Sequence, residues 1–256
     1  MNGRVVVVTG GGGGIGAAIA RRFLTDGDFV VIADVRPGAA DDVVAEHPSR
    51  CSFTATDVSS EADMEALIRS TVERHQRIDV MCNNAAILGS SHGVRDIDLN
   101  DYHAVFSTNV VGVLLGTKFA ASAMIASGGG GSIVNTASVA GLRGGVGPIL
   151  YSAAKHAVVG LTRSAASELA RHKIRVNAVA PGVVPTPMAA QSVTGDPTRV
   201  EEVADLLARR APFGRASTVD DIAGVVAFLA GDDSGYMTGE VLLVDGGATM
   251  AAPKRS

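Results

Sequence analysis

A tyrosine and a lysine four residues apart, Tyr151 and Lys155, form the pair in this sequence that is best suited to proton chemistry. Residues at this spacing share one face of a helix, and residues 151–171 have a helical pattern. A lysine ammonium near a phenol favours the phenolate and lowers the phenol pKa from about 10. The phenol can then exchange a proton with an alcohol or a carbonyl group. The pair alone is weak evidence, because a surface helix often carries Tyr-x-x-x-Lys by chance.

Ser138 supplies a hydroxyl that could act with this pair. It follows a predicted strand, residues 132–135, and so projects from the carboxyl edge of the expected sheet. A hydroxyl at that edge can hydrogen-bond a substrate oxygen.

A glycine-rich segment joins the first predicted strand, residues 5–8, to a helix that begins at about Ile15. The segment is Thr9-Gly10-Gly11-Gly12-Gly13-Gly14-Ile15-Gly16. Glycines let the backbone approach a pyrophosphate, and the helix N-terminus supplies amide donors and a positive dipole end. A flexible turn would explain the glycines alone, but the position between strand and helix favours a dinucleotide site. No Lys-Ser or Lys-Thr follows, which disfavours a P-loop.

Asp34 ends the second predicted strand, 18 positions after Gly16. Dinucleotide sites place an acidic residue about 20 positions on, where it accepts hydrogen bonds from ribose hydroxyls. A carboxylate there repels the 2′-phosphate of NADP, so Asp34 favours NAD. Arg36, two residues later, weakens this preference, and a capping or turn aspartate stays an alternative.

Short polar segments follow two further strands. Asp57-Val58 comes after residues 51–55, and Asn83-Asn84 comes after residues 78–82. Each would alone be ordinary turn chemistry. Together they stand at the strand ends where a cofactor is expected.

Apolar, Val- and Ile-rich segments alternate with longer helical patterns along the whole chain. Strands that are apolar throughout are buried on both faces, and strict alternation with helices implies right-handed crossovers and a parallel sheet. The predicted strands are residues 5–8, 29–33, 51–55, 78–82, 132–135, 174–179 and 241–244. The predicted helices are residues 15–25, 62–75, 99–126, 151–171 and 220–229. We therefore expect one α/β domain, residues 1–256, with a Rossmann-type doubly wound sheet of seven strands and helices on both faces.

The longest irregular stretch, residues 181–197, follows the sixth strand and leads into a short helical piece, residues 198–209. Ligands of such sheets bind outside the carboxyl ends of the strands. A long loop there is more often functional than idle. We expect residues 181 to about 215 to form a substrate loop.

Composition excludes several classes of partner. The 256 residues carry a formal net charge of −4 and no basic stripe, so neither nucleic acid nor a membrane surface is an expected partner. No apolar run reaches the length of a membrane span and no signal peptide precedes the first strand, so a cytoplasmic protein is expected. Cys51 and Cys82 are expected as buried thiols, and we predict no metal site.

The ordered motifs resemble the short-chain dehydrogenase/reductase family over nearly the whole chain. They are Thr-Gly-x-x-x-Gly-x-Gly at Thr9 to Gly16, Asn-Asn-Ala at Asn83 to Ala85, Thr108-Asn109-Val110, Ser138, Tyr151 with Lys155, Pro181-Gly182 with Thr186, and Asp245-Gly246-Gly247. The sequence has Ala86 where the family pattern has glycine.

This resemblance implies a role for each matching residue. Tyr151 would be the general acid or base, Lys155 would lower its pKa and bind the nicotinamide ribose, and Ser138 would polarise the substrate oxygen. Asn109 would hold a water that links Lys155 to solvent. The expected cofactor-binding residues are Gly10, Gly14, Ile15, Gly16, Asp34, Asp57, Val58, Asn84, Tyr151, Lys155, Val184 and Thr186. The resemblance also implies a homotetramer.

Two of these residues have simpler alternatives. Asn109 could bond back to its own helix, and Thr186 could only cap a short helix.

The substrate is less well defined by the sequence. The expected pocket wall is apolar, with Arg143 the one charge near it, and it consists of Ile87, Leu88, Val139, Leu142, Val146, Ile149, Leu150, Val183 and Met188. Residues 194–207 are similar to a branch that includes the borneol, xanthoxin and secoisolariciresinol dehydrogenases, which act on cyclic secondary alcohols. We therefore expect NAD-dependent interconversion of an apolar, cyclic secondary alcohol and its ketone. An NADP-dependent 3-oxoacyl-thioester reductase and an NAD(H)-sensing protein without turnover are the alternatives.

Overall fold

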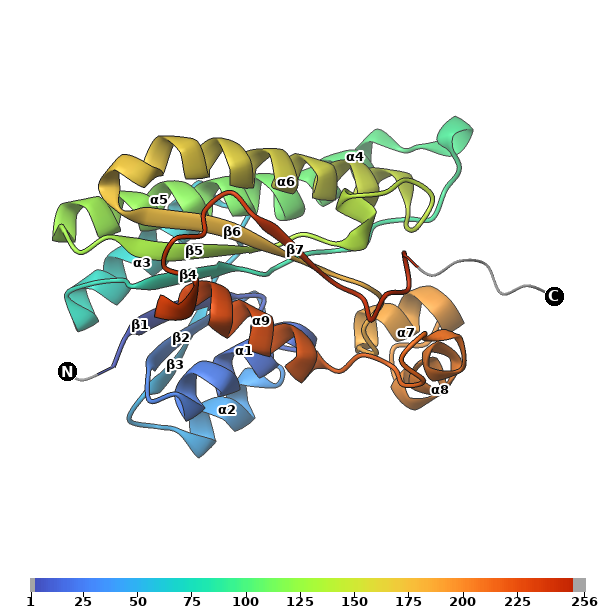
Figure 1. Cartoon of the computed structure of the whole chain (residues 1–256), viewed down its shortest axis with the longest axis horizontal. Coiled ribbons are helices and arrows are strands. Elements are labelled where there is room, and N and C mark those ends of the chain that lie inside the picture. Colours follow the sequence, from blue (N-terminus) through green and yellow to red (C-terminus); the bar gives the residue numbers. More distant parts are fainter. Residues whose placement is uncertain (1–2, 251–256) are drawn as a thin grey trace.

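The computed structural model describes residues 3–250 of the chain. Within them, seven parallel strands form one sheet in the order β3-β2-β1-β4-β5-β6-β7 (Figure 1). The order reverses direction beside β1, which makes the sheet doubly wound. The strands are β1 Val5–Thr9, β2 Phe29–Asp34, β3 Cys51–Ala55, β4 Val80–Asn83, β5 Gly131–Thr136, β6 Ile174–Pro181 and β7 Val241–Val244.

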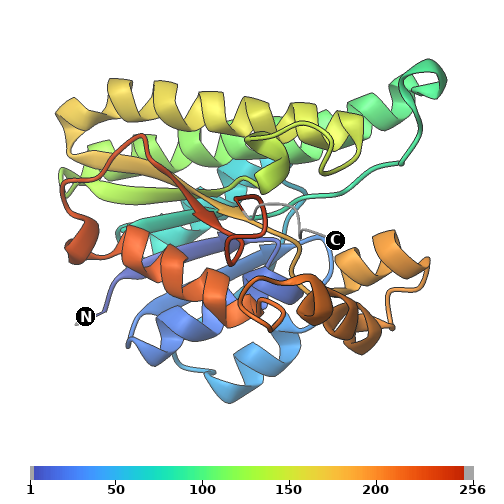
Figure 2. The same cartoon turned by 45° about the vertical axis from the view of Figure 1, so that its right-hand side comes forward.

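Helices cover both faces of the sheet (Figure 1). One face carries α1 Gly14–Thr25, α2 Ala40–Glu46 and α9 Val219–Ala230. The other carries α3 Glu61–His75, α4 Leu99–Phe106, α5 Gly112–Ser127 and α6 Ile149–Leu169. The remaining helices, α7 Pro187–Thr194 and α8 Val200–Arg210, form a small lobe beyond the carboxyl end of β6 (Figure 2).

The valine run in β1 shows why the strands are apolar throughout. Val6 and Val8 pack into the core beneath α1 and α9, whereas Val7 points to the opposite core beneath α3 and α5. Successive side chains of a strand face opposite sides, so a central parallel strand needs apolar residues at every position. The predicted fold, a seven-stranded parallel sheet with helices on both faces, is confirmed.

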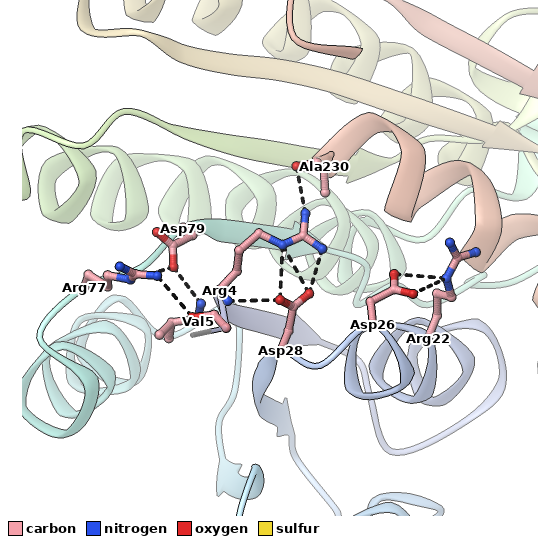
Figure 3. Close-up of polar contacts among 9 residues, drawn as sticks. Arg4, Val5, Arg22, Asp26, Asp28, Arg77, Asp79 and Ala230 are labelled. Atoms are coloured by element: carbon pink, nitrogen blue, oxygen red, sulfur yellow. Dashed lines mark hydrogen bonds and ion pairs between the residues drawn. The ribbon is translucent and has the colours of Figure 1, made fainter. Parts of the chain in front are cut away.

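Polar side chains tie the strands together at the amino end of the sheet, opposite the site (Figure 3). Arg4 forms an ion pair with Asp28 at 2.6 Å, and its guanidinium also donates to the Ala230 carbonyl at 3.2 Å. The Val5 amide donates to the Asp79 carboxylate at 2.7 Å. These contacts join β1 to the starts of β2 and β4 and to the end of α9.

The structure differs from the sequence-based expectation in several helices. The helix α2 lies in a segment that had no predicted element, and α7 lies inside the stretch expected to be irregular. The predicted helix 99–126 is divided into α4 and α5 by a π-helical turn at Ser107–Val111. This turn contains Asn109, whose side chain hydrogen-bonds the backbone of Ile87 in the segment after β4. The interruption of the helix therefore coincides with a tertiary contact, which a local sequence pattern does not reveal.

The helical stretch Leu99–Ser127 has a mean hydropathy of 1.6 over its most apolar window and is long enough to cross a membrane by length and composition. By length and composition, this stretch does not meet the expectation that no apolar run reaches the length of a membrane span. Its apolar residues Leu115, Ala120 and Met124 are buried in the core against the sheet, and 39% of the window is buried in all. The packing of α5 against the sheet therefore accounts for part of the apolar composition.

Candidate active site

A cavity of about 860 Å³ opens along the carboxyl ends of the strands, from β2 to β6. Its lining begins at the glycine-rich segment and ends at α6 and the start of α7. The lining residues are Gly10, Gly12, Gly13, Gly14, Ile15, Asp34, Val35, Arg36, Gly38, Thr56, Asp57, Val58, Ser59, Asn84, Ala85, Ala86, Ile87, Thr108, Thr136, Tyr151, Lys155, Thr186, Pro187 and Met188.

The glycine-rich segment is built for close backbone approach. Gly10 has a φ of +67°, and a Cβ added there would lie 2.6 Å from the Cα of Ala85. A Cβ on Gly16 would overlap the carbonyl of Gly10, so Gly16 packs behind the turn and does not line the cavity. Gly13, in contrast, has no described atom within 4 Å of a built Cβ. It faces open space at the N-terminus of α1, where amide groups can receive an anion.

Asp34 is held in a fixed orientation at the end of β2. One carboxylate oxygen accepts a hydrogen bond from the Gly12 amide at 3.0 Å. The other accepts from the Arg36 amide at 3.4 Å. The carboxylate is therefore fixed against the glycine-rich segment. Its oxygens can each accept further hydrogen bonds from a ligand in the cavity.

Asn84 joins the ends of three strands. Its side-chain Nδ2 donates to the carbonyls of Thr9 and Gly10 at 3.1 and 3.2 Å, and its Oδ1 accepts from the Thr136 hydroxyl at 3.3 Å. The side chain of Asn84 thus holds the cavity floor together. Its neighbours Ala85 and Ala86 line the cavity as well.

The third strand contributes the turn at Asp57 and Val58. The Asp57 carboxylate accepts from the amide and hydroxyl of Ser59 at 2.9 and 2.7 Å. Val58 is buried against Gly112 of α5, where a Cβ would approach it to 2.8 Å. Both residues line the cavity, at the end nearer to Asp34 than to Tyr151.

Tyr151 and Lys155 lie one turn apart on α6 and both line the cavity. The Lys155 ammonium donates to the carbonyl of Thr136 at 2.7 Å and lies 5.6 Å from the centre of the Tyr151 ring. Lys155 is only 1% exposed, and burial lowers its pKa to about 8. Tyr151 and Lys155 therefore share one face of α6, as their spacing predicts.

The Tyr151 side chain is partly buried. Its burial raises the pKa of the phenol, and a hydrogen bond with the Ser138 side chain opposes the rise. The net direction of the Tyr151 pKa shift is therefore upward, opposite to the lowering expected from its spacing to Lys155. Ser138 itself starts the turn after β5, where its hydroxyl accepts from the Ala140 amide at 3.1 Å.

Asn109 is fully buried in the π-helical turn between α4 and α5. Its Oδ1 accepts from the Ile87 amide, and its Nδ2 donates to the Ile87 carbonyl, both at 2.8 Å. The Asn109 side chain therefore bonds Ile87 and not the backbone of its own helix. The side chain instead fixes the segment after β4 that forms one wall of the cavity.

Thr186 and Val184 follow β6. The Thr186 hydroxyl caps α7 by accepting from the Ala189 amide at 3.3 Å, and Thr186 also lines the cavity. Val184 is buried in the core and does not line the cavity with its side chain. Both interpretations of Thr186, a cap and a cavity residue, are thus compatible with its position.

Most of the predicted site residues converge on one cavity. Those that do not line it are Gly16, Asn109, Ser138 and Val184. Sequence reasoning did not identify the roles of Gly12 and Thr136. Gly12 orients Asp34, and the Thr136 carbonyl holds Lys155. The role of Thr136 could have been found from the sequence, because this residue lies at a strand end, two residues before Ser138.

No group of three or more His, Cys, Asp or Glu side chains within residues 3–250 is arranged to hold a metal ion.

Comparison with known proteins places this geometry in a family. A family model described as enoyl-(acyl carrier protein) reductase matches residues 10–249. Short-chain dehydrogenase reductase ATA1 of Arabidopsis thaliana is 42% identical over 97% of this chain and 93% of its own length. A mitochondrial borneol dehydrogenase of Lavandula x intermedia is 39% identical over 98% of this chain and 92% of its own. A crystal structure of levodione reductase, 39% identical, superposes with a TM-score of 0.89 over 97% of this chain and 98% of that one.

The chain therefore belongs to the short-chain dehydrogenase/reductase family. It is an oxidoreductase of the kind that acts on alcohols and ketones with a nicotinamide cofactor. The residues present fit such a cofactor. The open space at Gly13 can take a pyrophosphate, the Asp34 carboxylate can take ribose hydroxyls, and the cavity continues to Tyr151 and Lys155.

Proposed function

We propose that this protein is an NAD(H)-dependent oxidoreductase that interconverts an apolar, cyclic secondary alcohol and its ketone. The observation that carries the proposal is the convergence of a partly buried phenol and a buried ammonium, Tyr151 and Lys155, on the same cavity as Asp34 and the glycine turn. The cavity lining runs from Asp34 to Tyr151, so these two residues would stand at the adenosine and nicotinamide ends of a bound dinucleotide.

The protein's own groups handle the proton. The bound cofactor supplies or accepts a hydride. Tyr151 donates its hydroxyl proton to the ketone oxygen in reduction and accepts the alcohol proton in oxidation. Ser138 orients the same substrate oxygen, and Lys155 binds the nicotinamide ribose and holds a positive charge beside the phenol. The residues Gly10, Gly14, Ile15, Asp57, Val58, Asn84, Val184 and Thr186 surround the rest of the cofactor.

The choice of NAD rests on Asp34. Its carboxylate is oriented by the Gly12 and Arg36 amides, so it cannot turn away from an incoming 2′-phosphate without losing two hydrogen bonds. Like charges forced together in this way cost several kcal/mol. The Arg36 side chain also lines the cavity, and it supports a second candidate function in which an NADP-dependent reductase acts on a 3-oxoacyl thioester.

The choice of substrate rests on the wall beside Tyr151. Ala86, Ile87 and Met188 line this part of the cavity and are uncharged. Arg143, the one charge expected near the wall, donates to the Thr249 carbonyl at 3.0 Å and so ties the loop after Ser138 to the carboxyl-terminal segment. An apolar lining with the Tyr151 hydroxyl fits a substrate that has one polar group. The names of two similar proteins, borneol dehydrogenase and levodione reductase, agree with an alcohol and a ketone.

Residues 181–215 form the substrate loop in this proposal. The helices α7 and α8 pack mainly on each other, outside the two helical layers (Figure 2). Phe213, which is 75% exposed, stands at the end of the loop near Gly246. Closure of this segment over a bound substrate would bury apolar area and exclude water from Tyr151.

Assembly and location complete the proposal. The large apolar side chains Leu99, Leu114 and Ile125 are exposed on α4 and α5, and Phe228 and Leu243 are exposed at α9 and β7. Two separate exposed apolar faces suit a homotetramer with two kinds of contact. Light scattering in solution tests this assembly. The two free, buried cysteines agree with a reducing compartment such as the cytoplasm.

The test is a screen of cyclic and acyclic secondary alcohols with NAD and with NADP, in which reduced cofactor is followed by absorbance. The proposal expects turnover of cyclic, apolar alcohols with a clear preference for NAD. A clear preference for NADP together with reduction of a 3-oxoacyl thioester would establish the second candidate. Tight NADH binding without turnover of any alcohol or ketone would instead indicate a sensor.

A further inference from the structure

Three polar side chains form a chain of hydrogen bonds inside the protein, between the sheet and α6. Asn83 of β4 donates from Nδ2 to Oδ1 of Asn135 on β5 at 2.9 Å. Asn135 donates in turn to the Thr162 hydroxyl of α6 at 2.9 Å. Thr162 donates to the Val158 carbonyl of its own helix at 2.8 Å. The three side chains are at most 2% exposed.

Apart from the Lys155–Thr136 bond at the site, the rest of the contact between α6 and the sheet is apolar. Val158 and Val159 of α6 pack against Ala137, Ala178 and Ala180. Apolar contact has no preferred direction and allows a helix to rotate or slide by a fraction of an ångström at little cost. A buried hydrogen bond is directional, and breaking it leaves a donor without a partner. The Asn135–Thr162 bond therefore sets the register of α6 on β5.

This bond acts on the same two elements that carry the reaction centre. Thr162 stands seven residues after Lys155, two helical turns along the same face of α6. Asn135 immediately precedes Thr136, whose carbonyl accepts from Lys155. A rotation or slide of α6 relative to β5 thus changes both the Lys155–Thr136 contact and the position of Tyr151 relative to Ser138.

The network is closed on its far side by α5. Asn83 and Asn135 are directly paired across β4 and β5. A Cβ on Gly116 would overlap Oδ1 of Asn83, and this oxygen has no hydrogen-bond partner within the described part of the chain. Asn83 thus has one buried oxygen without a hydrogen-bond partner, while its Nδ2 group bonds Asn135. An apolar residue at position 83 would avoid that cost, so the network has a use beyond stability.

We propose that Asn135 and Thr162 are positioning residues of the reaction, because their hydrogen bond fixes α6 so that Tyr151 and Lys155 meet the substrate and cofactor in the productive geometry. This inference rests on the proposed function for the roles of Tyr151 and Lys155. Neither Asn135 nor Thr162 lines the cavity, so both would act on the reaction through Tyr151 and Lys155.

The experiment compares variants of the network with a matched control. Thr162→Val removes the hydroxyl and keeps the shape, and Thr162→Ser restores the hydroxyl. Asn83→Leu, Asn135→Leu and Thr162→Val together remove all three side chains of the network. This triple variant can be nearly neutral for stability, because no buried side-chain donor of the network is left unpaired. The control is Thr71→Val in α3, because Thr71 is equally buried and donates to the Leu67 carbonyl four residues back at 2.8 Å, far from the site.

The readouts separate position from stability. Steady-state kinetics give kcat and KM for alcohol oxidation, and NADH fluorescence gives cofactor affinity. The sequence has three tyrosines and no tryptophan. Tyr102→Phe with Tyr236→Phe therefore leaves Tyr151 as the sole phenol, and ultraviolet titration of this background reports its ionisation directly.

The expected result is a loss of about tenfold to a hundredfold in kcat for Thr162→Val, with NADH affinity and KM within about twofold of the parent. The triple variant should regain the unfolding midpoint but not kcat, whereas Thr162→Ser should regain kcat. The titration of Tyr151 should shift to higher pH in both proteins that lack the bond.

The inference is overturned if kcat and the Tyr151 titration of the triple variant match those of Thr71→Val. A Thr162→Val protein that fails to fold leaves this comparison intact, because the triple variant and Thr162→Ser decide it. If the parent protein turns over no alcohol or ketone, the proposed function fails, and the titration alone then confirms or refutes the positional role.

Discussion

The side chain of Asn109 makes both of its hydrogen bonds with one residue, Ile87. Its Oδ1 accepts from the Ile87 amide and its Nδ2 donates to the Ile87 carbonyl, at 2.8 Å each. The pair closes a ring between the π-helical turn of Ser107–Val111 and the segment after β4. The family resemblance assigns Asn109 a bound water. In this structure the amide group serves first to hold the cavity wall.

We predict that Asn109→Ala destabilises the protein and disturbs the wall. It removes the partners of the Ile87 amide and carbonyl, whose contacts with Asn109 are part-buried, at up to about 1–3 kcal/mol for each unsatisfied group. Urea unfolding measures the loss, and the substrate KM should rise because Ile87 moves. Asn100→Ala, on the exposed side of α4, is the control and should leave both quantities unchanged. A stability within about 0.5 kcal/mol of the parent would contradict the structural role of Asn109.

Lys155 should reduce stability at neutral pH. Burial lowers its pKa from 10.5 to about 8, so the folded protein releases this proton before the unfolded chain does. Below about pH 8 the buried charge costs about 3 kcal/mol, and this cost disappears as the pH rises from about 8 to 10.5. Lys155→Met should therefore be more stable than the parent at pH 7 by up to this amount.

The stability difference between Lys155→Met and the parent should shrink above pH 8. Urea unfolding of the two proteins across this range measures it. Cys51, whose pKa burial raises to about 11, titrates in the opposite sense but is present in both proteins and cancels. Equal stabilities at pH 7, with no convergence at higher pH, would contradict the buried charge.

The sheet could be predicted from sequence because its strands are short segments rich in apolar residues that alternate with longer helical patterns. Cys51–Ala55 and Val241–Val244 were placed with their exact bounds, and other strands to within one or two residues. Two features resisted prediction. The helix α2 is short, with few buried residues to mark its period, and the interruption at Asn109 accompanies a contact with Ile87 that no local pattern encodes.

The site could be predicted where a residue type carries the chemistry, as for Tyr151, Lys155 and Asp34. The site could not be predicted where a backbone atom, and not a side chain, makes the contact. The Gly12 amide that orients Asp34 and the Thr136 carbonyl that holds Lys155 could belong to almost any residue type. The sign of the Tyr151 pKa shift was also missed, because it depends on burial and not on the spacing to Lys155.

Asp34 should determine cofactor preference. Asp34→Ala removes the carboxylate that opposes a 2′-phosphate and leaves Arg36 on the cavity wall. The ratio of kcat/KM for NAD to that for NADP should fall by at least about tenfold. Glu46→Ala, an exposed change in α2, is the control. An unchanged ratio in the Asp34 variant would show that another residue selects the cofactor.

The rate should depend on pH in opposite senses in the two directions. Oxidation needs Tyr151 as a base, so kcat/KM for the alcohol should rise between about pH 6 and 10. Burial raises the Tyr151 pKa, so no plateau is expected early in this range. Ketone reduction needs the protonated phenol and should not rise with pH. Profiles with the same slope in both directions would argue against Tyr151 as the group that exchanges the proton.

The most direct test of the account is alcohol oxidation by Tyr151→Phe beside its parent, with NADH affinity measured on both. The phenol hydroxyl is the group that exchanges the proton, so its removal should lower kcat by about 10²- to 10⁴-fold while NADH affinity stays within about twofold. Tyr236→Phe, which alters a fully exposed ring, should behave like the parent. Turnover by Tyr151→Phe within about tenfold of the parent would contradict the assignment of Tyr151 as the general acid and base.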